Sequence, residues 1–347
     1  MRRNGAGPRR AGPGRRRPGA RAARGRVTAA EPRVLVLNPS PLTGPIGRVW
    51  GRAAVEARAR LANAGVVETR GDGGDADRLA EHLGRTHPAV VVAGGGDGTV
   101  HLVVEALMRL DAARRPALAI LPLGTANNVA RSLGLAAVRA GGTAALARAL
   151  AAATDGRARP LDLGHAADRH LVGSLALGMD ADILALRNRA CARWGLGRGA
   201  GGYPLYLWSC AVNVLARRHG ASARLALDGA WETCRPYNIL VTNTALYAGE
   251  FRFDAGDHSA DGRLDCHVFA DARDYVRRFV RAWRRQVAHE RGGAITPAPE
   301  LRRIREARVE LAAPVAVQID GEEVPPVEAL TVRVLPGALT VRVPAAV

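Results

Sequence analysis

Lysine is absent from this chain of 347 residues, and all 50 of its basic side chains are arginines. This absence excludes a Walker phosphate loop, which requires a lysine. No stretch reaches the roughly eighteen uninterrupted apolar residues of a membrane-spanning helix, and the first residues lack the apolar core of a signal peptide. The four cysteines form no metal-like pair, so we predict reduced thiols in a cytoplasmic protein; they are Cys191, Cys210, Cys234 and Cys266.

The formal charge of +18 is unevenly distributed. Residues 1–30 hold ten arginines and no acid, in a Gly-, Pro- and Arg-rich stretch that cannot bury apolar surface. We predict that 1–30 is a disordered leader. Its arginines could attract nucleic acid or anionic lipid, or serve no particular role, and we expect no specific nucleic-acid partner.

The segment from Pro88 to Val100 organises the rest of the chain. A run of β-forming residues ends there in three glycines, and the sequence continues with Asp97, Gly98 and Thr99. This pattern predicts a buried strand, a loop whose amides can approach phosphate, and a helix whose N-terminus favours an anion. Asp97 would repel phosphate unless a divalent cation or a hydroxyl lay between them, so it indicates metal–nucleotide chemistry. A glycine-rich turn without a ligand is the alternative.

Strand-like and helix-like segments alternate from Arg33 to about Ala153. The alternation predicts a doubly wound parallel α/β nucleotide-binding domain over residues 31–157, with ligands at the carboxyl ends of its strands. Short strands separated by turns follow Pro160, interrupted by helices over 203–218 and 271–290. They predict an antiparallel β domain over residues 158–330. The end of the chain is expected to form two strands around Pro336-Gly337.

Five motifs occur in the order found in the diacylglycerol kinase catalytic-domain family: Gly95–Thr99, Pro122–Arg131, Leu161–Gly164, Asp261–Asp265 and Asp320–Glu322. Over residues 33–345 the chain resembles the soluble bacterial lipid kinases of this family, which are related to sphingosine and ceramide kinases. The resemblance implies an ATP-binding α/β domain and a lipid-binding β-sandwich domain, with the last strands, 331–347, returning to the first domain. It also implies ATP- and Mg²⁺-dependent transfer of the γ-phosphoryl group to a membrane lipid hydroxyl, of diacylglycerol or a related lipid.

The resemblance assigns ATP contacts to Asn38, Thr69, Gly95, Gly96, Asp97, Gly98, Thr99 and Thr125. Glu322 matches the general base, and Asp97 and Asp320 complete the catalytic set. Asp320 lies two residues before Glu322, so on a strand the two carboxylates would share a face and could bind a cation or accept the hydroxyl proton.

A structural Mg²⁺ site maps onto the Asp261 carboxylate and the carbonyls of His258 and Arg263, an all-oxygen set that suits a hard cation. Both Asp-Gly pairs, at 261–262 and 320–321, are also ordinary turn sequences. His165, His170 and His267 have no spacing that suggests a metal site, and we interpret them as incidental.

Three positions depart from the family pattern. His101-Leu102 replaces Asn-Glu, Asn128 replaces Asp, and Pro41 stands where glycine is expected. They leave two alternatives open, a catalytically weak lipid- or nucleotide-binding regulator and an NAD kinase-like enzyme. The second is disfavoured because the Asn-Glu pair and the Thr-Gly-Ser-Thr-Ala-Tyr segment of NAD kinases are missing.

Residues 271–291 predict an amphipathic helix. Its apolar stripe is flanked by seven arginines and three acids, and consists of Val276, Phe279, Val280, Trp283 and Val287. The pattern is typical of a helix that docks a peripheral protein on an anionic membrane. A stripe that packs on the β domain is the alternative. The sequence does not indicate an oligomeric state.

Overall fold

The computed structural model describes residues 31–39, 45–61, 63–195, 202–216, 220–256, 258–296 and 298–345. The predicted disordered leader and the departure at Pro41 lie outside these residues. The four cysteines lie within them and form no disulfide. No helix of this described part is both long and apolar enough to cross a bilayer.

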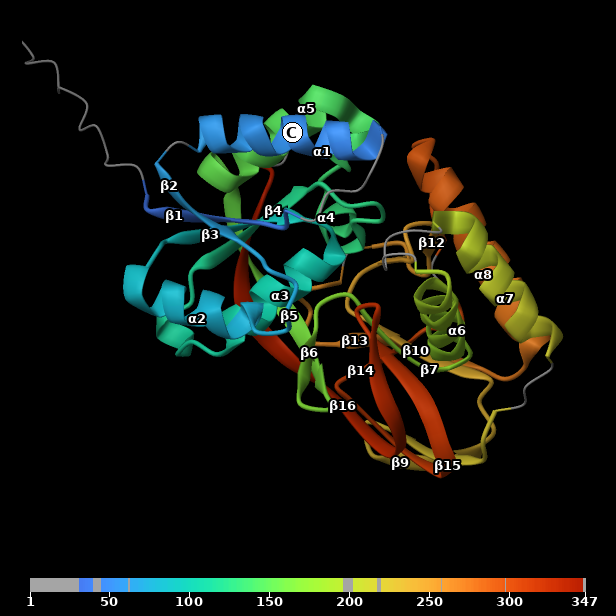
Figure 1. Cartoon of the computed structure of the whole chain (residues 1–347). Coiled ribbons are helices and arrows are strands. Elements are labelled where there is room, and N and C mark those ends of the chain that lie inside the picture. The colour runs from blue at the N-terminus through green and yellow to red at the C-terminus, as the bar shows by residue number, and fades with distance from the viewer. Residues whose placement is uncertain are drawn as a thin grey trace, which may run out of the picture. The chain divides into compact units, whose positions relative to one another are not determined.

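A parallel sheet with the strand order β4-β3-β1-β2 forms the centre of the N-terminal half. Its strands are β1 (Arg33–Leu37), β2 (Ala64–Glu68), β3 (Val90–Gly95) and β4 (Ala117–Pro122). β3 is buried along its whole length because helices cover both faces of the sheet. Figure 1 shows α1 (Pro45–Arg60) and α5 (Val138–Asp155) on one face, and α2 (Asp75–Thr86) and α3 (Asp97–Met108) on the other. The predicted doubly wound arrangement is confirmed.

The C-terminal half is largely antiparallel, as predicted. Five of its strands follow the order β14-β13-β10-β7-β15; β8 pairs with β15 and β9, and β6 pairs with β5. The strands are β5 (Arg157–Ala166), β6 (Arg169–Leu171), β7 (Ser174–Gly178), β8 (Ala223–Leu227), β9 (Ala230–Cys234), β10 (Asn238–Thr242), β13 (Leu264–Phe269), β14 (Arg302–Ile304) and β15 (Glu306–Ile319). β11 (Leu246–Tyr247) and β12 (Phe251–Arg252) form a separate small sheet.

The last strand, β16 (Glu322–Val343), connects the two halves. It is antiparallel to β15 and β5, and it lies parallel to β4, where Val341 is opposite Leu118. The prediction of two strands around Pro336-Gly337 was wrong. The strand continues through this dipeptide with an irregular register against β5, and the Gly337 N–H donates to Asp162 Oδ1 at 2.7 Å. A turn sequence here forms a bulge instead of a hairpin.

Three helices lie on the antiparallel half: α6 (Met179–Arg193), α7 (Gly202–Leu215) and α8 (Ala272–Glu290). The sequence patterns predicted α7 and α8 but not α6. α8 begins after Asp271, whose side chain accepts the Asp274 N–H at 2.8 Å as a helix cap. All four phenylalanines of the chain belong to the aromatic cluster on which α8 packs, or contact it. A few aromatic residues therefore suffice to anchor these helices, because they are concentrated in one place.

Candidate active site

The predicted phosphate loop lies in tight contact with the loop that follows β4. A Cβ atom on Gly124 would lie 2.3 Å from the Cα of Gly96, and one on Gly95 would lie 2.1 Å from Thr99 Oγ1. Only glycine allows the two backbones to approach this closely. Asn127 fixes the second loop through two hydrogen bonds with the Gly124 backbone, of 3.0 and 2.8 Å. The two loops therefore form one preorganised unit at the carboxyl edge of the sheet.

Asp97 occupies the first turn of α3 and is half-buried. Its Oδ1 accepts the Val129 N–H at 3.2 Å and its Oδ2 accepts from Asn128 Nδ2 at 3.3 Å, so it joins α3 to the short helix α4 (Asn128–Ser132). Burial raises the pKa of the Asp97 carboxyl, the two amide groups oppose this, and the negative charge of Asp320 raises the pKa further. Both hydrogen-bond donors are neutral amides, which leave the negative charge of Asp97 without a compensating positive one.

Asp320 lies in the two-residue turn between β15 and β16, together with Gly321. Their φ angles are +49° and +83°, as a tight hairpin turn requires. Asp320 is therefore not on a strand, and the expectation that it shares a strand face with Glu322 was wrong. Its side chain is 5% exposed. One oxygen accepts the N–H groups of Gly173 and Ser174, and the other accepts that of Val172, all at 2.8 Å.

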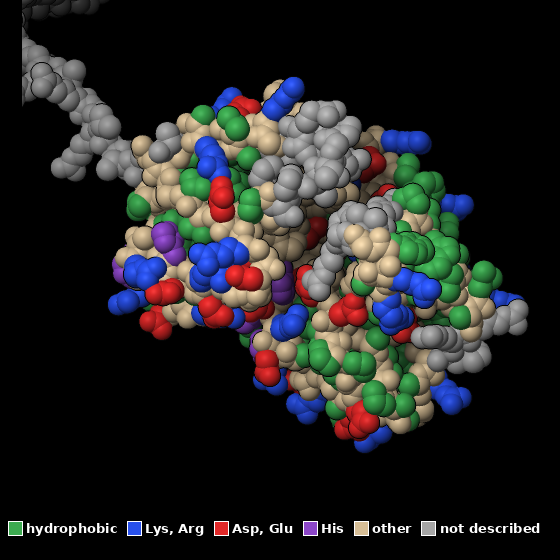
Figure 2. All heavy atoms as spheres, in the orientation of Figure 1, with side chains coloured by type: hydrophobic (Ala, Val, Ile, Leu, Met, Phe, Trp, Pro, Cys, Tyr) green, Lys and Arg blue, Asp and Glu red, His purple; other side chains and the backbone are tan. Residues whose placement is uncertain are grey.

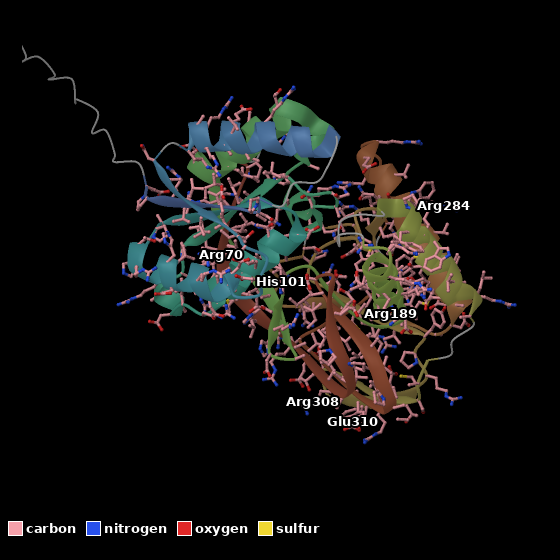
Figure 3. All side chains as sticks on the ribbon, in the orientation of Figure 1. Arg70, His101, Arg189, Arg284, Arg308 and Glu310 are labelled. Atoms are coloured by element: carbon pink, nitrogen blue, oxygen red, sulfur yellow. The ribbon has the colours of Figure 1, made fainter. Side chains whose placement is uncertain are left out.

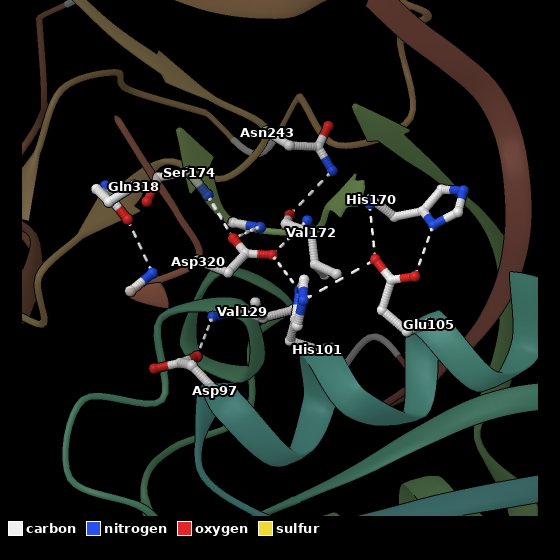
Figure 4. A network of polar contacts seen from close by, with 12 residues as sticks. Asp97, His101, Glu105, Val129, His170, Val172, Ser174, Asn243, Gln318 and Asp320 are labelled. Atoms are coloured by element: carbon white, nitrogen blue, oxygen red, sulfur yellow. Dashed lines mark hydrogen bonds and ion pairs between the residues drawn. The ribbon is translucent and has the colours of Figure 1, made fainter. Parts of the chain in front are cut away.

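His101 supplies the fourth contact of the Asp320 carboxylate, with Nδ1 2.9 Å from Oδ2 (Figure 4). One turn further along α3, Glu105 accepts the His170 N–H at 2.7 Å and lies 3.1 Å from His170 Nδ1. Burial alone would lower the pKa of His101, but the hydrogen bond to Asp320 and the charges of Asp320, Glu105 and Glu322 raise it overall. His101, one of the departures from the family pattern, thus links α3 to the turn between β15 and β16, and His170, which we interpreted as incidental, links α3 to β6.

Glu322 is the first residue of β16, directly after this turn, and is half-buried opposite Ile319. Its charge is one of those that raise the pKa of His101. The carboxylate matched to the general base therefore directly follows the turn that Asp320 anchors.

A cavity of about 330 Å³ lies between the phosphate-loop region and the antiparallel half. On the α/β side, Asp97 and Asn128 line it, and the hairpin contributes Asp320 and Gly321. The helices α6 and α7 and the strand β11 contribute Asp180, Leu184, Arg187, Tyr206, Leu246 and Tyr247 to the lining. The cavity therefore combines acidic groups beside the phosphate loop with an apolar and aromatic wall.

Asp180 is a buried acid in that wall. The Tyr275 hydroxyl donates to its Oδ1, and Asn238 Nδ2 donates to its Oδ2 at 2.8 Å. Burial raises its pKa to about 6, and the hydrogen bonds from Tyr275, Asn238 and Tyr247 limit the rise. Sequence reasoning did not find Asp180, because it lies in the helix that was not predicted.

The remaining predicted ATP contacts follow the ends of adjacent parallel strands. Asn38 follows β1, Thr69 follows β2 and Thr125 follows β4. Leu37 pairs with both Glu68 and Gly94, so these strand ends are level along one edge. Thr125 is exposed, and Thr69 lines a separate cavity of about 300 Å³ together with Arg70, Arg78 and Leu102. The structure brings these residues to the same edge as Asp97.

The predicted structural metal site surrounds an arginine. Arg303 Nη2 lies 2.9 Å from Asp254 Oδ2, and its other nitrogens lie 3.9 Å from Asp261 and 3.6 Å from Asp265. Burial raises the pKa of Asp265 to about 7, the charge of Asp254 adds to the rise, and Arg303 opposes it.

Asp261 Oδ1 accepts the Arg263 N–H at 2.9 Å, while its Oδ2 lies 3.8 Å from His258 Nδ1. This second oxygen is beyond hydrogen-bonding distance of both His258 and Arg303, so it can take a water or a hard cation. The Asp261 carboxylate therefore fits an oxygen-ligated ion with one oxygen, while the His258 carbonyl accepts the Asp261 N–H at 3.3 Å and Arg303 is a competing positive charge. Among the described residues, no group of three or more acidic, histidine or cysteine side chains is arranged to hold a metal.

Comparison with known proteins decides the family. The diacylglycerol kinase catalytic domain matches residues 32–166, and the YegS C-terminal NAD kinase beta sandwich-like domain matches residues 173–343. A Pseudomonas aeruginosa protein described as "Probable lipid kinase YegS-like" is 32% identical over 304 residues, which cover 85% of this chain and 89% of that protein. The chain belongs to the YegS-like lipid kinase family. Membership in this kinase family implies the use of ATP.

Other YegS-like relatives match over shorter stretches. A Chromohalobacter salexigens protein with the same description is 39% identical over 131 residues, which cover 37% of this chain and 40% of that protein. A crystal structure described as a diacylglycerol kinase from Bacillus anthracis str. Sterne superposes with a TM-score of 0.66 at 19% identity, covering 91% of this chain and 98% of that one. At this identity, the superposition shows a shared fold.

Proposed function

We propose that this chain is an ATP- and Mg²⁺-dependent kinase that phosphorylates a hydroxyl group of a membrane lipid, diacylglycerol or a related one. The observation that carries the proposal is the cavity lined by Asp97, Asp320 and the aromatic wall of α6, α7 and β11. It offers a place for a lipid hydroxyl beside the phosphate loop. The protein would work in the cytoplasm, in peripheral contact with an anionic membrane surface.

We assign roles to these residues from the family resemblance together with their positions. Glu322 removes the proton of the lipid hydroxyl, whose oxygen then attacks the γ-phosphorus while ADP leaves. Asp320 holds the turn that presents Glu322, because its carboxylate is occupied by three amides and His101. The glycine loop from Gly95 to Thr99 binds the phosphates, and Asn38, Thr69 and Thr125 contact the nucleotide at the strand ends.

Asp97 is the residue that would hold a catalytic Mg²⁺. Its negative charge is half-buried and its hydrogen bonds come from neutral amides, which fits a divalent cation as the partner. When bound, Mg²⁺ neutralises charge on the transferred phosphoryl group. The chain's own contribution is to fix the position of the Asp97 carboxylate between α3 and α4.

Incubation with radiolabelled ATP and Mg²⁺ tests the proposed function. We expect label in one or more of detergent-dispersed diacylglycerol, ceramide, sphingosine and phosphatidylglycerol, and none in NAD. Label in NAD alone would establish the NAD kinase-like alternative. Binding of ATP without transfer to any of these acceptors would support the regulator.

We also propose that Asp261, with the carbonyls of His258 and Arg263, holds a structural Mg²⁺. A bound ion stabilises the folded state by mass action, so Mg²⁺ should raise the melting temperature of the unaltered chain by roughly 2–4 °C per kcal/mol of binding. Asp261→Ala should abolish this rise, and Arg303→Gln should increase it by removing the competing charge. Differential scanning fluorimetry with NaCl of equal ionic strength as the control measures the shift. An identical Mg²⁺ response in Asp261→Ala would refute the site.

A further inference from the structure

α7 buries two polar side chains and exposes several large apolar ones. Ser209 and Asn213 are 0% and 5% exposed, and each donates to a carbonyl of the preceding turn of the same helix. The outward side chains include Leu207, Trp208, Val212 and Leu215, which are 48%, 45%, 38% and 79% exposed. α7 contains no charged residue. A helix that faces water has the opposite arrangement, so this face suits an apolar environment.

The apolar surface extends onto the neighbouring helices. Trp194, at the end of α6, is exposed and its ring lies 6.3 Å from that of Trp208. Eight of the eleven exposed large hydrophobic side chains in the described part of the chain lie on α7, on α8 or at the end of α6. We call this set the apolar patch: Trp194, Leu207, Trp208, Val212, Leu215, Val276, Val280 and Trp283. Figure 2 shows hydrophobic side chains gathered where Figure 1 places α7 and α8.

In α8, the apolar stripe predicted for residues 271–291 is divided between an inward and an outward face. Phe279 is buried and Val287 is half-buried, so these two members of the expected stripe face inward. Val276, Val280 and Trp283 face outward. The helix packs on the β domain with one side and exposes apolar groups on another, because its apolar residues cover more than one face.

Exposed arginines border the apolar patch on α8 and α6. The outward face of α8 carries exposed Arg273, Arg277, Arg281 and Arg284, and the last turns of α6 add Arg189 and Arg193. Figure 3 shows Arg284 beside α8 and Arg189 on α6, and Figure 2 shows arginines at the margin of the patch. Arg277 and Arg281 also form ion pairs, with Asp274 and Glu300. Apolar and tryptophan side chains bordered by arginines match the boundary between the acyl chains and the anionic headgroups of a bilayer.

The helices α6 and α7, which contribute to the apolar patch, also line the cavity. Tyr206 of α7 lines the cavity, while the next two residues, Leu207 and Trp208, face outward. Leu184 and Arg187 of α6 also line the cavity, and α6 packs against α7. The same two helices therefore have one side on the cavity and another on the patch.

We propose that the apolar patch inserts into the headgroup boundary of an anionic bilayer, and that the lipid reaches the cavity past α6 and α7. The route of the lipid rests on the proposed function, whereas insertion of the patch does not. A protein partner or a second copy of this chain would cover the patch without any dependence on lipid.

The test uses the full chain, so that the basic leader is the same in every sample. Trp208→Glu/Trp283→Glu places two charges within the patch, and Trp231→Glu on β9 is the matched control because Trp231 is 42% exposed elsewhere. Co-sedimentation with phosphatidylglycerol vesicles, without ATP, measures binding. We expect the double variant to bind about tenfold or more weakly than the control variant. Arg273→Glu/Arg284→Glu should also weaken binding and reduce its dependence on salt, with Arg308→Glu as its control.

Kinase assays then distinguish a loss of membrane binding from a loss of catalytic activity. The double tryptophan variant should lose activity on vesicles and keep it on detergent-dispersed lipid. Equal vesicle binding by Trp208→Glu/Trp283→Glu and Trp231→Glu would overturn the proposal. So would a dimer of the unaltered chain that becomes a monomer only in the double variant, because a second copy would then cover the patch. If no form phosphorylates dispersed lipid, the proposed function fails, while the binding comparison still decides the role of the patch.

Discussion

Replacing Glu322 with glutamine is expected to lower kcat by about 10²–10⁴, the usual contribution of a positioned general base. Glutamine has the same shape but cannot accept the proton of the lipid hydroxyl. The fold and the affinity for ATP should not change, because the turn before Glu322 is fixed by Asp320 and not by Glu322 itself. Steady-state kinetics on dispersed lipid, ATP titration and the melting temperature measure the three quantities.

Glu323→Gln is the matched control. Glu323 is the next residue on β16, and its side chain accepts a hydrogen bond from Asn188 of α6. Successive side chains of a strand point to opposite faces, so Glu323 is directed away from the face that Glu322 occupies. Its substitution should leave kcat within about threefold of the original, a much smaller change than loss of a base produces. A similar kcat for Glu322→Gln and Glu323→Gln would remove Glu322 from the mechanism.

Local patterns in the sequence predicted the parts of the site that depend on neighbours along the chain. A buried β-run that ends in glycine indicated β3 and the loop at Gly95, and the alternation of strands and helices placed Asn38, Thr69 and Thr125 at one sheet edge. Glycine is also required in these loops for a second reason, which the spacing of the residues in the sequence does not reveal. Gly96 and Gly124 are required because two loops from different strands touch.

The contacts between the two halves could not be predicted in the same way. His101 and Asp320 are 219 positions apart, and only the path of β16 across both halves brings them together. Asp180 and Tyr206 belong to helices packed on a cavity wall, and α6 gave too weak a periodic signal to be recognised. An Asp-Gly pair is consistent with a turn or a catalytic motif, and at 320–321 the structure shows a turn whose acid also supports the proposed base.

Asp320→Ala is expected to destabilise the fold by about 3–5 kcal/mol, because three backbone N–H groups and His101 lose a buried acceptor together. At roughly 2–4 °C per kcal/mol, the melting temperature should fall by roughly 6–20 °C. The turn that carries Glu322 loses its anchor, so kcat should fall about tenfold or more. Asp320→Asn keeps one acceptor oxygen and should recover part of both losses. Thermal unfolding and kinetics on dispersed lipid measure these effects.

Asp228→Ala is the matched control for Asp320→Ala. Asp228 also precedes a glycine in a turn with positive φ, and its Oδ1 accepts the N–H groups of Arg305 and Glu306 at 2.8 and 2.9 Å. It lies in the turn between β8 and β9, so its loss should lower the melting temperature without changing kcat. A large fall in kcat for Asp320→Ala at an unchanged melting temperature would contradict a positioning role. Asp320 would then act on the substrate or the metal directly, as its pairing with Glu322 in the sequence first indicated.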